Sequence, residues 1–173
     1  MTNDPHQATF ETLLSRCTAS AVHLEMRDDY TPSDPVFLDW KAGVHVDPKE
    51  RWREWYDLMV ATTARAVKVR RARIVSEPVT DFIRYEYDLT EGLNLAAGEE
   101  VRWLPRRQAS DLALPGNDFW VFDNRLVRFG YFAGNGDILD DEFTEDEAVV
   151  HLCTTAFESV WHRAIPHQHY RIS

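Results

Sequence analysis

The chain has 173 residues, of which 44% are hydrophobic and 28% charged, a balance typical of a single soluble globular domain. Its net charge of −10 argues against direct binding to nucleic acid, because that affinity depends on cations that neutralise phosphates. The sequence has no apolar run of membrane-spanning length, and its start, MTNDPHQATF, does not have the pattern of a signal peptide. We therefore expect a cytoplasmic protein with no membrane attachment.

The first half of the chain predicts three helices and two strands. Residues 9–17 are expected to form a helix capped by Thr9, and SAVHLEM (20–26) a strand. A second helix is expected to start at Asp47-Pro48-Lys49-Glu50, where Asp47 can cap and proline suits the first turn. VKVRRARIV (67–75) follows as a strand, and residues 79–87 as a short helix.

The second half predicts a strand, a hairpin and a closing helix. VRWLP (101–105) is the strand, and GNDFWVFDNRLVRFG (116–130) has the pattern of two strands joined by a tight turn. After the acidic segment 136–148, a capping box beginning at Thr144 starts a long amphipathic helix that Pro166 ends. This order predicts a single α/β domain over residues 1–173, with a core at 20–165 and a mixed sheet.

Nothing in the sequence predicts a cofactor. Cys17 and Cys153 are too few for a disulfide framework or a zinc site. His162, His167 and His169 could together bind zinc or nickel, but a proline interrupts the predicted helix between them. We therefore predict no metal.

Several strings in the chain resemble a family of actinobacterial proteins of unknown function. They extend over nearly the whole chain: SAVHLEMRDDY, VRRARIVSEPVTDFIRYE, VRWLPRR, LPGNDFWVFD and AFESVWHRAIPH. Members of that family are often encoded beside small helix-turn-helix regulators. The resemblance therefore implies such a regulator as a partner, but no particular activity.

The order of elements, best over residues 67–165, also resembles one half of the phospholipase D-like fold. In those enzymes a His-x-Lys-x(4)-Asp motif opens a hairpin that a glycine closes. Aligned without a gap, Asp123 takes the place of the motif's aspartate and Gly130 that of the closing glycine. Gly116 stands where the histidine should be, and Asp118 where the lysine should be.

These two departures predict that the ancestral phosphodiester transfer is lost. That reaction needs an imidazole to attack phosphorus and an ammonium to hold the phosphate oxygens. Gly116 has no side chain, and Asp118 would repel a phosphate. Because phospholipase D-like enzymes pair two half-domains, the resemblance also implies that a single half could form a homodimer.

Asp118 and Asp123 at the ends of the first hairpin strand have two interpretations. They could act as a carboxylate pair in metal or acid-base chemistry. However, they are five residues apart, so on a strand their side chains lean to opposite faces. Strand-end carboxylates that accept hydrogen bonds from the backbone or from arginine are the favoured interpretation.

The arginines of the strand 67–75 need partners. Alternation places Arg71 and Arg73 on one face and Arg70 on the other, and a buried guanidinium without an anion is costly. One alternative, slightly favoured, is a structural network that pairs them with Glu25, Glu77, Asp118 or Asp123. The other is an open anion pocket on which Arg27, Arg84 and Arg106 also converge.

His23, Glu25 and Arg27 alternate along the strand 20–26 and so share a face. They could place an acid, a base and an anion clamp together, although an ordinary hydrogen-bonded core histidine is favoured. The six tryptophans are expected mainly in the core, with Trp40 and Trp103 as candidates to line a pocket or a partner surface.

Two hypotheses follow. The first is a non-catalytic phospholipase D-like domain that senses a small anionic ligand, or docks with a helix-turn-helix regulator, through Arg27, Arg71, Arg73, Arg84, Arg106, Asp118 and Asp123. The second is an enzyme with a re-equipped site that acts on a small anionic substrate through His23, Glu25, Asp118 and Asp123.

Overall fold

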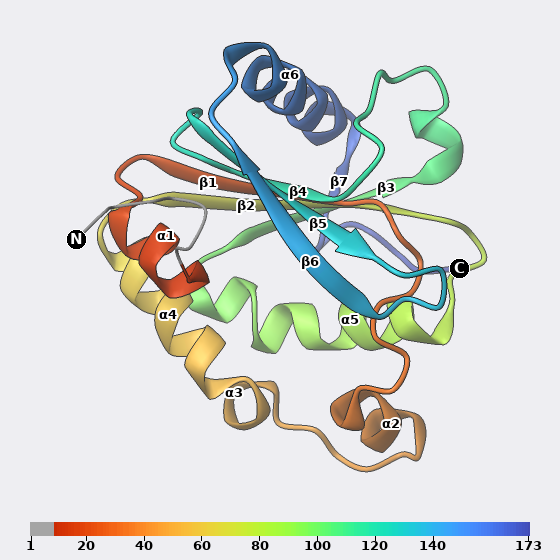
Figure 1. The fold of residues 1–173 in the computed structure, drawn as a ribbon. Coiled ribbons are helices and arrows are strands. Elements are labelled where there is room, and N and C mark those ends of the chain that lie inside the picture. The colour runs from red at the N-terminus through yellow and green to blue at the C-terminus, as the bar shows by residue number, and fades with distance from the viewer. Residues whose placement is uncertain (1–8) are drawn as a thin grey trace.

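The computed structural model describes residues 9–173, and it contains one seven-stranded mixed sheet with helices on both faces (Figure 1). Most of the N-terminal segment used to predict the absence of a signal peptide lies outside these residues. The strands lie in the order β6-β5-β4-β1-β2-β3-β7. Their bounds are β1 (Ser20–Glu25), β2 (Lys68–Val75), β3 (Glu100–Pro105), β4 (Phe119–Phe122), β5 (Leu126–Phe132), β6 (Ile138–Thr144) and β7 (Ile165–Pro166).

The centre of the sheet is parallel and its two edges are antiparallel. β1 pairs with β2 and β2 with β3 in parallel, whereas β4, β5 and β6 continue antiparallel from β1 and β7 pairs antiparallel with β3. The predicted α/β class with a mixed sheet is confirmed. The predicted strands 20–26, 67–75 and 101–105 and the hairpin all form within a residue or two of the expected bounds.

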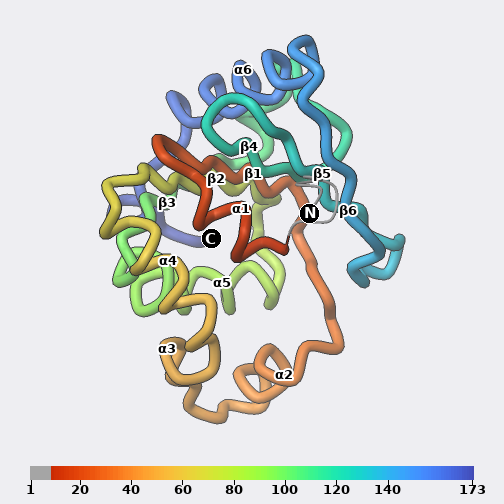
Figure 2. The backbone as a smooth tube through the Cα atoms, turned by 60° about the vertical axis from the view of Figure 1, so that its left-hand side comes forward, coloured from red at the N-terminus to blue at the C-terminus, as the bar shows by residue number. Residues whose placement is uncertain are grey.

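One face of the sheet is covered by α6 (Glu147–Arg163), as Figure 2 shows from the side. Val150, Cys153 and Phe157 of this helix pack on the inward side chains of the central strands. The predicted capping box at Thr144 is wrong, because Thr144 is the last residue of β6 and pairs with β5. Asp146 caps the helix instead and accepts hydrogen bonds from the backbone N–H groups of the first turn.

The other helices lie on the opposite face (Figures 1 and 2). Thr9 caps the first of them, as predicted. The helix expected from Asp47 is broken in two at Trp52, whose φ of −118° and ψ of 35° are not helical. The bounds are α1 (Phe10–Arg16), α2 (Pro35–Lys41), α3 (Pro48–Arg51), α4 (Arg53–Ala64) and α5 (Asp81–Gly92).

Three elements were not anticipated. α2 begins with Asp34 as cap and Pro35 in its first turn, and it buries only Phe37. β6 is an edge strand whose residues are all exposed or half-buried. It therefore lacks the alternation of hydrophobic and polar residues by which a strand is recognised in a sequence. β7 is only two residues long. Short 3₁₀ turns follow α5 (Leu95–Ala97) and β3 (Arg106–Ala109).

Candidate functional site

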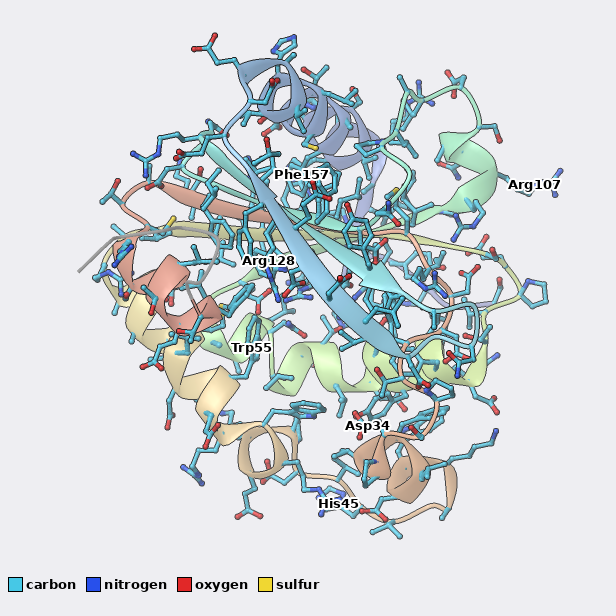
Figure 3. The ribbon with its side chains drawn as sticks, in the orientation of Figure 1. Asp34, His45, Trp55, Arg107, Arg128 and Phe157 are labelled. Carbon is cyan, nitrogen blue, oxygen red and sulfur yellow. The ribbon has the colours of Figure 1, made fainter. Side chains whose placement is uncertain are left out.

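A cavity of about 610 Å³ lies on the face of the sheet that α4 and α5 cover. Its walls come from five strands (β1, β2, β4, β5 and β6), from three helices (α1, α4 and α5) and from the loop between β1 and α2. Figure 3 shows Trp55, Arg128 and Asp34, which line it, on this side of the sheet, and Phe157 on the opposite side beneath α6. Most of the remaining lining residues are aromatic or ionisable: Phe10, His23, Glu25, Tyr30, Trp52, Arg71, Arg73, Phe82, Tyr85, Glu86, Asp118, Phe119, Trp120, Phe132 and Asp141.

The floor of the cavity is a buried ion-pair network on β1 and β2. The parallel register sets Glu25 beside Arg73, and Glu25 bridges both arginines of β2, with distances of 2.5 Å to Arg71 Nη1 and 2.5 Å to Arg73 Nε. Arg71 also binds Glu99 at 3.0 Å, and Arg73 binds Glu86 at 3.4 Å. The prediction that Arg71 and Arg73 share a face opposite Arg70 is confirmed.

Arg70 lies on the opposite face of the sheet from Arg71 and Arg73, where it pairs with Glu158 of α6 at 2.6 Å. Of the partners proposed for Arg71 and Arg73 from sequence, only Glu25 is found. Glu86 and Glu99 supply the rest of the charge. Glu86 comes from α5 and Glu99 directly precedes β3, the neighbour of β2 in the sheet, so their proximity to the two arginines follows from the tertiary structure.

The network holds Glu25, Arg71 and Arg73 in their charged forms. Burial by itself would raise the pKa of Glu25, but Arg73 and Arg71 outweigh it and the pKa lies well below its usual range. Burial would lower the pKa values of Arg71 and Arg73, and the adjacent carboxylates raise them instead. A buried ion network of this kind is costly to break by removing one partner.

His23 is part of the floor as a neutral acceptor. Arg71 Nη1 lies 2.9 Å from His23 Nδ1, and because arginine can only donate, Nδ1 accepts and the ring proton is assigned to Nε2. Burial lowers the pKa of His23 well below its usual value, although Glu25 acts in the opposite direction. The ring stacks on Trp120, with centroids 4.3 Å apart and planes 15° apart.

Asp118 and Glu86 form an acidic wall beside this floor. Asp118 is 5% exposed, accepts a hydrogen bond from Met26 N at 2.9 Å and accepts a short one from the Tyr30 hydroxyl. Burial raises the pKa of Asp118 to about 6, although the bond from Tyr30 counteracts it. Burial also raises the pKa of Glu86 to about 7, against the attraction of Arg73.

Aromatic rings enclose the rest of the cavity. Tyr30 packs against Phe82 and Phe132 with ring centroids 5.7 and 5.2 Å away, and Phe82 lies 5.7 Å from Tyr85. On the opposite side, Trp55 lies between Phe10 and Trp120. Trp52 and Trp55 thus line the cavity, whereas they were expected in the core. Trp120 is buried in a hydrophobic core cluster, as expected, and also lines the cavity.

Trp40 and Trp103, the two tryptophans expected at a pocket or partner surface, lie elsewhere. Trp103 is fully buried in the hydrophobic core, and its Nε1 donates to His167 at 3.1 Å. Trp40 donates to Asp88 at 3.0 Å and does not line the cavity.

Asp123 lies away from the cavity, at the turn of the β4–β5 hairpin. Its carboxylate accepts hydrogen bonds from the backbone N–H groups of Thr18, Ala19 and Ser20, at 2.9, 2.7 and 3.0 Å. Burial opposes ionisation, but these bonds outweigh it and hold the pKa of Asp123 well below its usual range. It therefore accepts backbone hydrogen bonds, as the favoured interpretation expected.

The other three arginines of the predicted anion pocket do not line this cavity. Arg106 donates to Met26 O at 2.7 Å and pairs with Asp28 at 3.2 Å. Arg27 lies over the Phe132 ring and donates to Ala133 O at 3.3 Å. Arg84 is a half-buried residue on α5. Of the predicted site residues, the cavity therefore brings together His23, Glu25, Arg71, Arg73 and Asp118.

Sequence reasoning missed Tyr30, Glu86 and the aromatic enclosure. Glu86 carried a usable signal, because Phe82, Glu86 and Leu89 lie at helical spacing on one face of α5, and a carboxylate in an apolar stripe requires a partner. Tyr30 lies in a loop rich in Asp and Pro, where no periodicity points to burial.

Two further properties concern residues 9–173. Within them, no three His, Cys, Asp or Glu side chains are arranged so that they could hold one metal ion. No helix in this part of the chain has the length and apolar character required to cross a membrane.

Comparisons with known proteins identify a family and a fold. Residues 8–172 match the family described as a domain of unknown function, DUF6879. No protein in a search of curated proteins matches the sequence. Among solved structures, the chain is similar to Nuc, a phospholipase D family member from Salmonella typhimurium, with a TM-score of 0.52 and 11% identity over 93% of this chain and 88% of Nuc. At that identity the similarity shows the fold alone.

Proposed function

The chain belongs to the DUF6879 family and has a phospholipase D-like fold, and from this premise we propose that it is a small-molecule-binding domain that does not transfer phosphodiesters. The ligand occupies the cavity between the sheet and α5. The observation that carries the proposal is the cavity itself, which combines a volume of about 610 Å³ with a floor of buried, mutually fixed ions.

The dimensions and lining of the cavity support a binding role. Sites for small ligands are typically concave spaces of roughly 300–1,000 Å³ with mostly apolar walls and a few fixed polar groups. Here Glu25, Arg71 and Arg73 hold one another in place, so a ligand would meet a polar surface that needs no rearrangement.

The residues at the aligned motif positions support the absence of phosphodiester transfer. Gly116 does not line the cavity. Asp118 lines it, with an acidic side chain at the position where the phospholipase D-like motif has a lysine. No histidine of the chain is followed two residues later by a lysine. Nothing at these positions could act as the nucleophile or hold the phosphate in the way the phospholipase D-like reaction requires.

A second candidate is an enzyme that uses the same cavity for proton transfer. The observation that favours it is the pair of raised pKa values, about 6 for Asp118 and about 7 for Glu86. Carboxylic acids that hold a proton near neutral pH often act as general acids. In this alternative Asp118 and Glu86, rather than His23 and Glu25, exchange protons with the substrate, because Arg71 binds both His23 and Glu25.

A helix-turn-helix regulator and a second copy of the chain stay predictions as partners. Both can be tested directly, the first by affinity purification from native cells with identification of DNA-binding proteins. The second is tested by light scattering, which gives the mass in solution relative to the 20.1 kDa of one chain.

Thermal shift and native mass spectrometry with a library of amines, nucleosides, nucleotides, sugar phosphates and carboxylic acids test the binding proposal. A ligand present at about 100 times its Kd stabilises by about 2.7 kcal/mol, which for a domain of this size raises Tm by roughly 5–10 °C.

The control uses two exposed neighbours on β6. Ile138 lines the cavity mouth and is 67% exposed, whereas Leu139 is 63% exposed and does not line it. Ile138→Trp should abolish the shift and Leu139→Trp should preserve it. If no compound of any class binds, or if both variants bind equally, the proposal is wrong.

A further inference from the structure

We propose that the ligand is an organic cation, a protonated or quaternary amine on an apolar group, held by Glu86, Asp118 and the rings of Tyr30, Phe82 and Tyr85. This inference rests on the proposed binding function and specifies its ligand. It differs from the expectation of an anionic ligand, which was based on the number of arginines rather than on their partners.

The charges around the cavity favour a cation. The lining includes five carboxylates, Glu25, Asp34, Glu86, Asp118 and Asp141, against three arginines, Arg71, Arg73 and Arg128. Five minus three leaves an excess of two acids, and His23 contributes no charge because its pKa is lowered. A ligand phosphate or carboxylate would therefore enter an acidic space.

The arginines are also already bound by acids. Arg71 pairs with Glu25 and Glu99, Arg73 pairs with Glu25 and Glu86, and Arg128 pairs with Asp141. An anionic ligand would have to compete with carboxylates that are built into the fold. A cation meets less competition, because Asp118 forms no salt bridge with any residue in the described part of the chain and Arg73 contacts only one oxygen of Glu86.

Three buried polar atoms of cavity-lining residues form no hydrogen bond of good geometry in the described part of the chain: Glu86 Oε2, the Tyr85 hydroxyl and Trp52 Nε1. Glu86 Oε2 accepts no hydrogen bond from residues 9–173, and Arg73, the one ionic partner of Glu86 among them, contacts the other oxygen at 3.4 Å. Tyr85 is 3% exposed, and burial raises the pKa of its hydroxyl, although the Trp52 indole acts on it as a hydrogen-bond donor and opposes that rise. A buried carboxylate oxygen left unpaired is costly, and a ligand ammonium N–H beside Glu86 Oε2 would supply the missing donor.

The aromatic rings at this end of the cavity do not already face a cation from the described part of the chain. Arg71 lies over Trp55 and Trp120, Arg27 over Phe132 and Arg128 over Phe10, so four of the lining rings already face a guanidinium. No Lys or Arg among residues 9–173 lies over Tyr30, Phe82 or Tyr85. Adjacent aromatic faces beside a carboxylate are the usual recognition site of alkylammonium groups.

Three probes of similar size and different charge test this inference: phenethylamine, 2-phenylethanol and phenylacetate, titrated calorimetrically at pH 8. Phenethylamine, which is cationic at this pH, should bind at least 10-fold more tightly than the alcohol, and phenylacetate should not bind measurably. The same order should hold among the amines and acids of the library used for the binding proposal.

Matched variants locate the cation. Glu86→Gln should weaken phenethylamine at least 10-fold and leave 2-phenylethanol unchanged. Glu91→Gln removes the same charge from an exposed position of the same helix and should leave both affinities unchanged. Circular dichroism and Tm establish that both variants are folded.

The outcomes separate this inference from the proposed function. If phenylacetate or another anion binds best, or if the alcohol matches the amine, the cavity binds ligands but the cation assignment is wrong. If amines bind and Glu86→Gln has no greater effect than Glu91→Gln, the assigned position is wrong. If neither the probes nor any library compound binds, both proposals fail together.

Discussion

Asp118 and Asp123 lie at the two ends of β4 and face different parts of the molecule. The carboxylate of Asp118 lines the cavity and accepts the Tyr30 hydroxyl, whereas that of Asp123 binds the backbone ahead of β1. A strand advances about 3.3 Å per residue, so five residues separate them by roughly 16 Å. They cannot act as one carboxylate pair, and substitutions at the two positions should have separable effects.

Asp123→Ala should destabilise the fold and leave ligand binding intact. The substitution leaves the N–H groups of Thr18, Ala19 and Ser20 without their acceptor, and the loss is expected to be about 1–3 kcal/mol. Urea denaturation measures it. Asp29→Ala, at an exposed residue of the β1–α2 loop, should change stability by less than about 0.5 kcal/mol. Equal effects of the two variants would contradict the role given to Asp123.

Glu25→Gln should be among the most destabilising charge-removing substitutions. It leaves Arg71 and Arg73 buried with reduced compensation, and removal of one partner from a buried ion network costs about 3–5 kcal/mol. Glu158→Gln breaks the half-exposed pair with Arg70 on the other face and should cost less than about 1 kcal/mol. Denaturation of both variants at pH 7 makes the comparison, and a cost below 1 kcal/mol for Glu25→Gln would contradict the role of the network.

Glu86 should make the protein less stable as pH rises. Its folded pKa of about 7 lies above the value of about 4.3 expected in the unfolded chain, so between these limits the folded state binds more protons. Stability contributed by this group is present below pH 4 and is lost as pH rises to 7. The groups that face Glu86 are Arg73 and Arg71 on β2, Glu25 on β1, and Asp118.

Glu86→Gln removes this dependence because the amide resembles the protonated acid. Relative to the unsubstituted protein, the variant should gain roughly 2–4 kcal/mol between pH 5 and pH 8 in urea denaturation. Glu91→Gln should show no such gain. His23 acts in the opposite direction, since its lowered pKa costs stability as pH falls below about 6.5, but this contribution is common to all three proteins and cancels in the comparison.

Incubation with bis(p-nitrophenyl) phosphate should release no p-nitrophenol above the buffer rate. The chain offers neither an imidazole at position 116 nor an ammonium at position 118 for phosphodiester transfer. Hydrolysis by the purified protein that Asp118→Asn or Ile138→Trp abolishes would contradict the proposed function. Such a result would favour the enzymatic alternative.

Local signals in the sequence determined most of the secondary structure. Thr9 and Asp47 were recognised as caps because capping depends on residues within one turn. The central strands were recognised from apolar runs, and alternation alone placed Arg71 and Arg73 on one face of β2. β6 escaped recognition because an exposed edge strand carries no hydrophobic alternation.

Only the tertiary structure decided what those arginines bind and what the cavity recognises. Glu86 and Glu99 reach β2 from α5 and from the segment before β3, and no local rule specifies which face of a covering helix meets a strand. The packing of helices on this face of the sheet also places Trp52 and Trp55 beside the cavity rather than in the core. The periodicity of apolar residues along the sequence indicates which side chains are buried. The charge and shape of the space around a buried side chain depend on contacts between segments that are distant in the sequence.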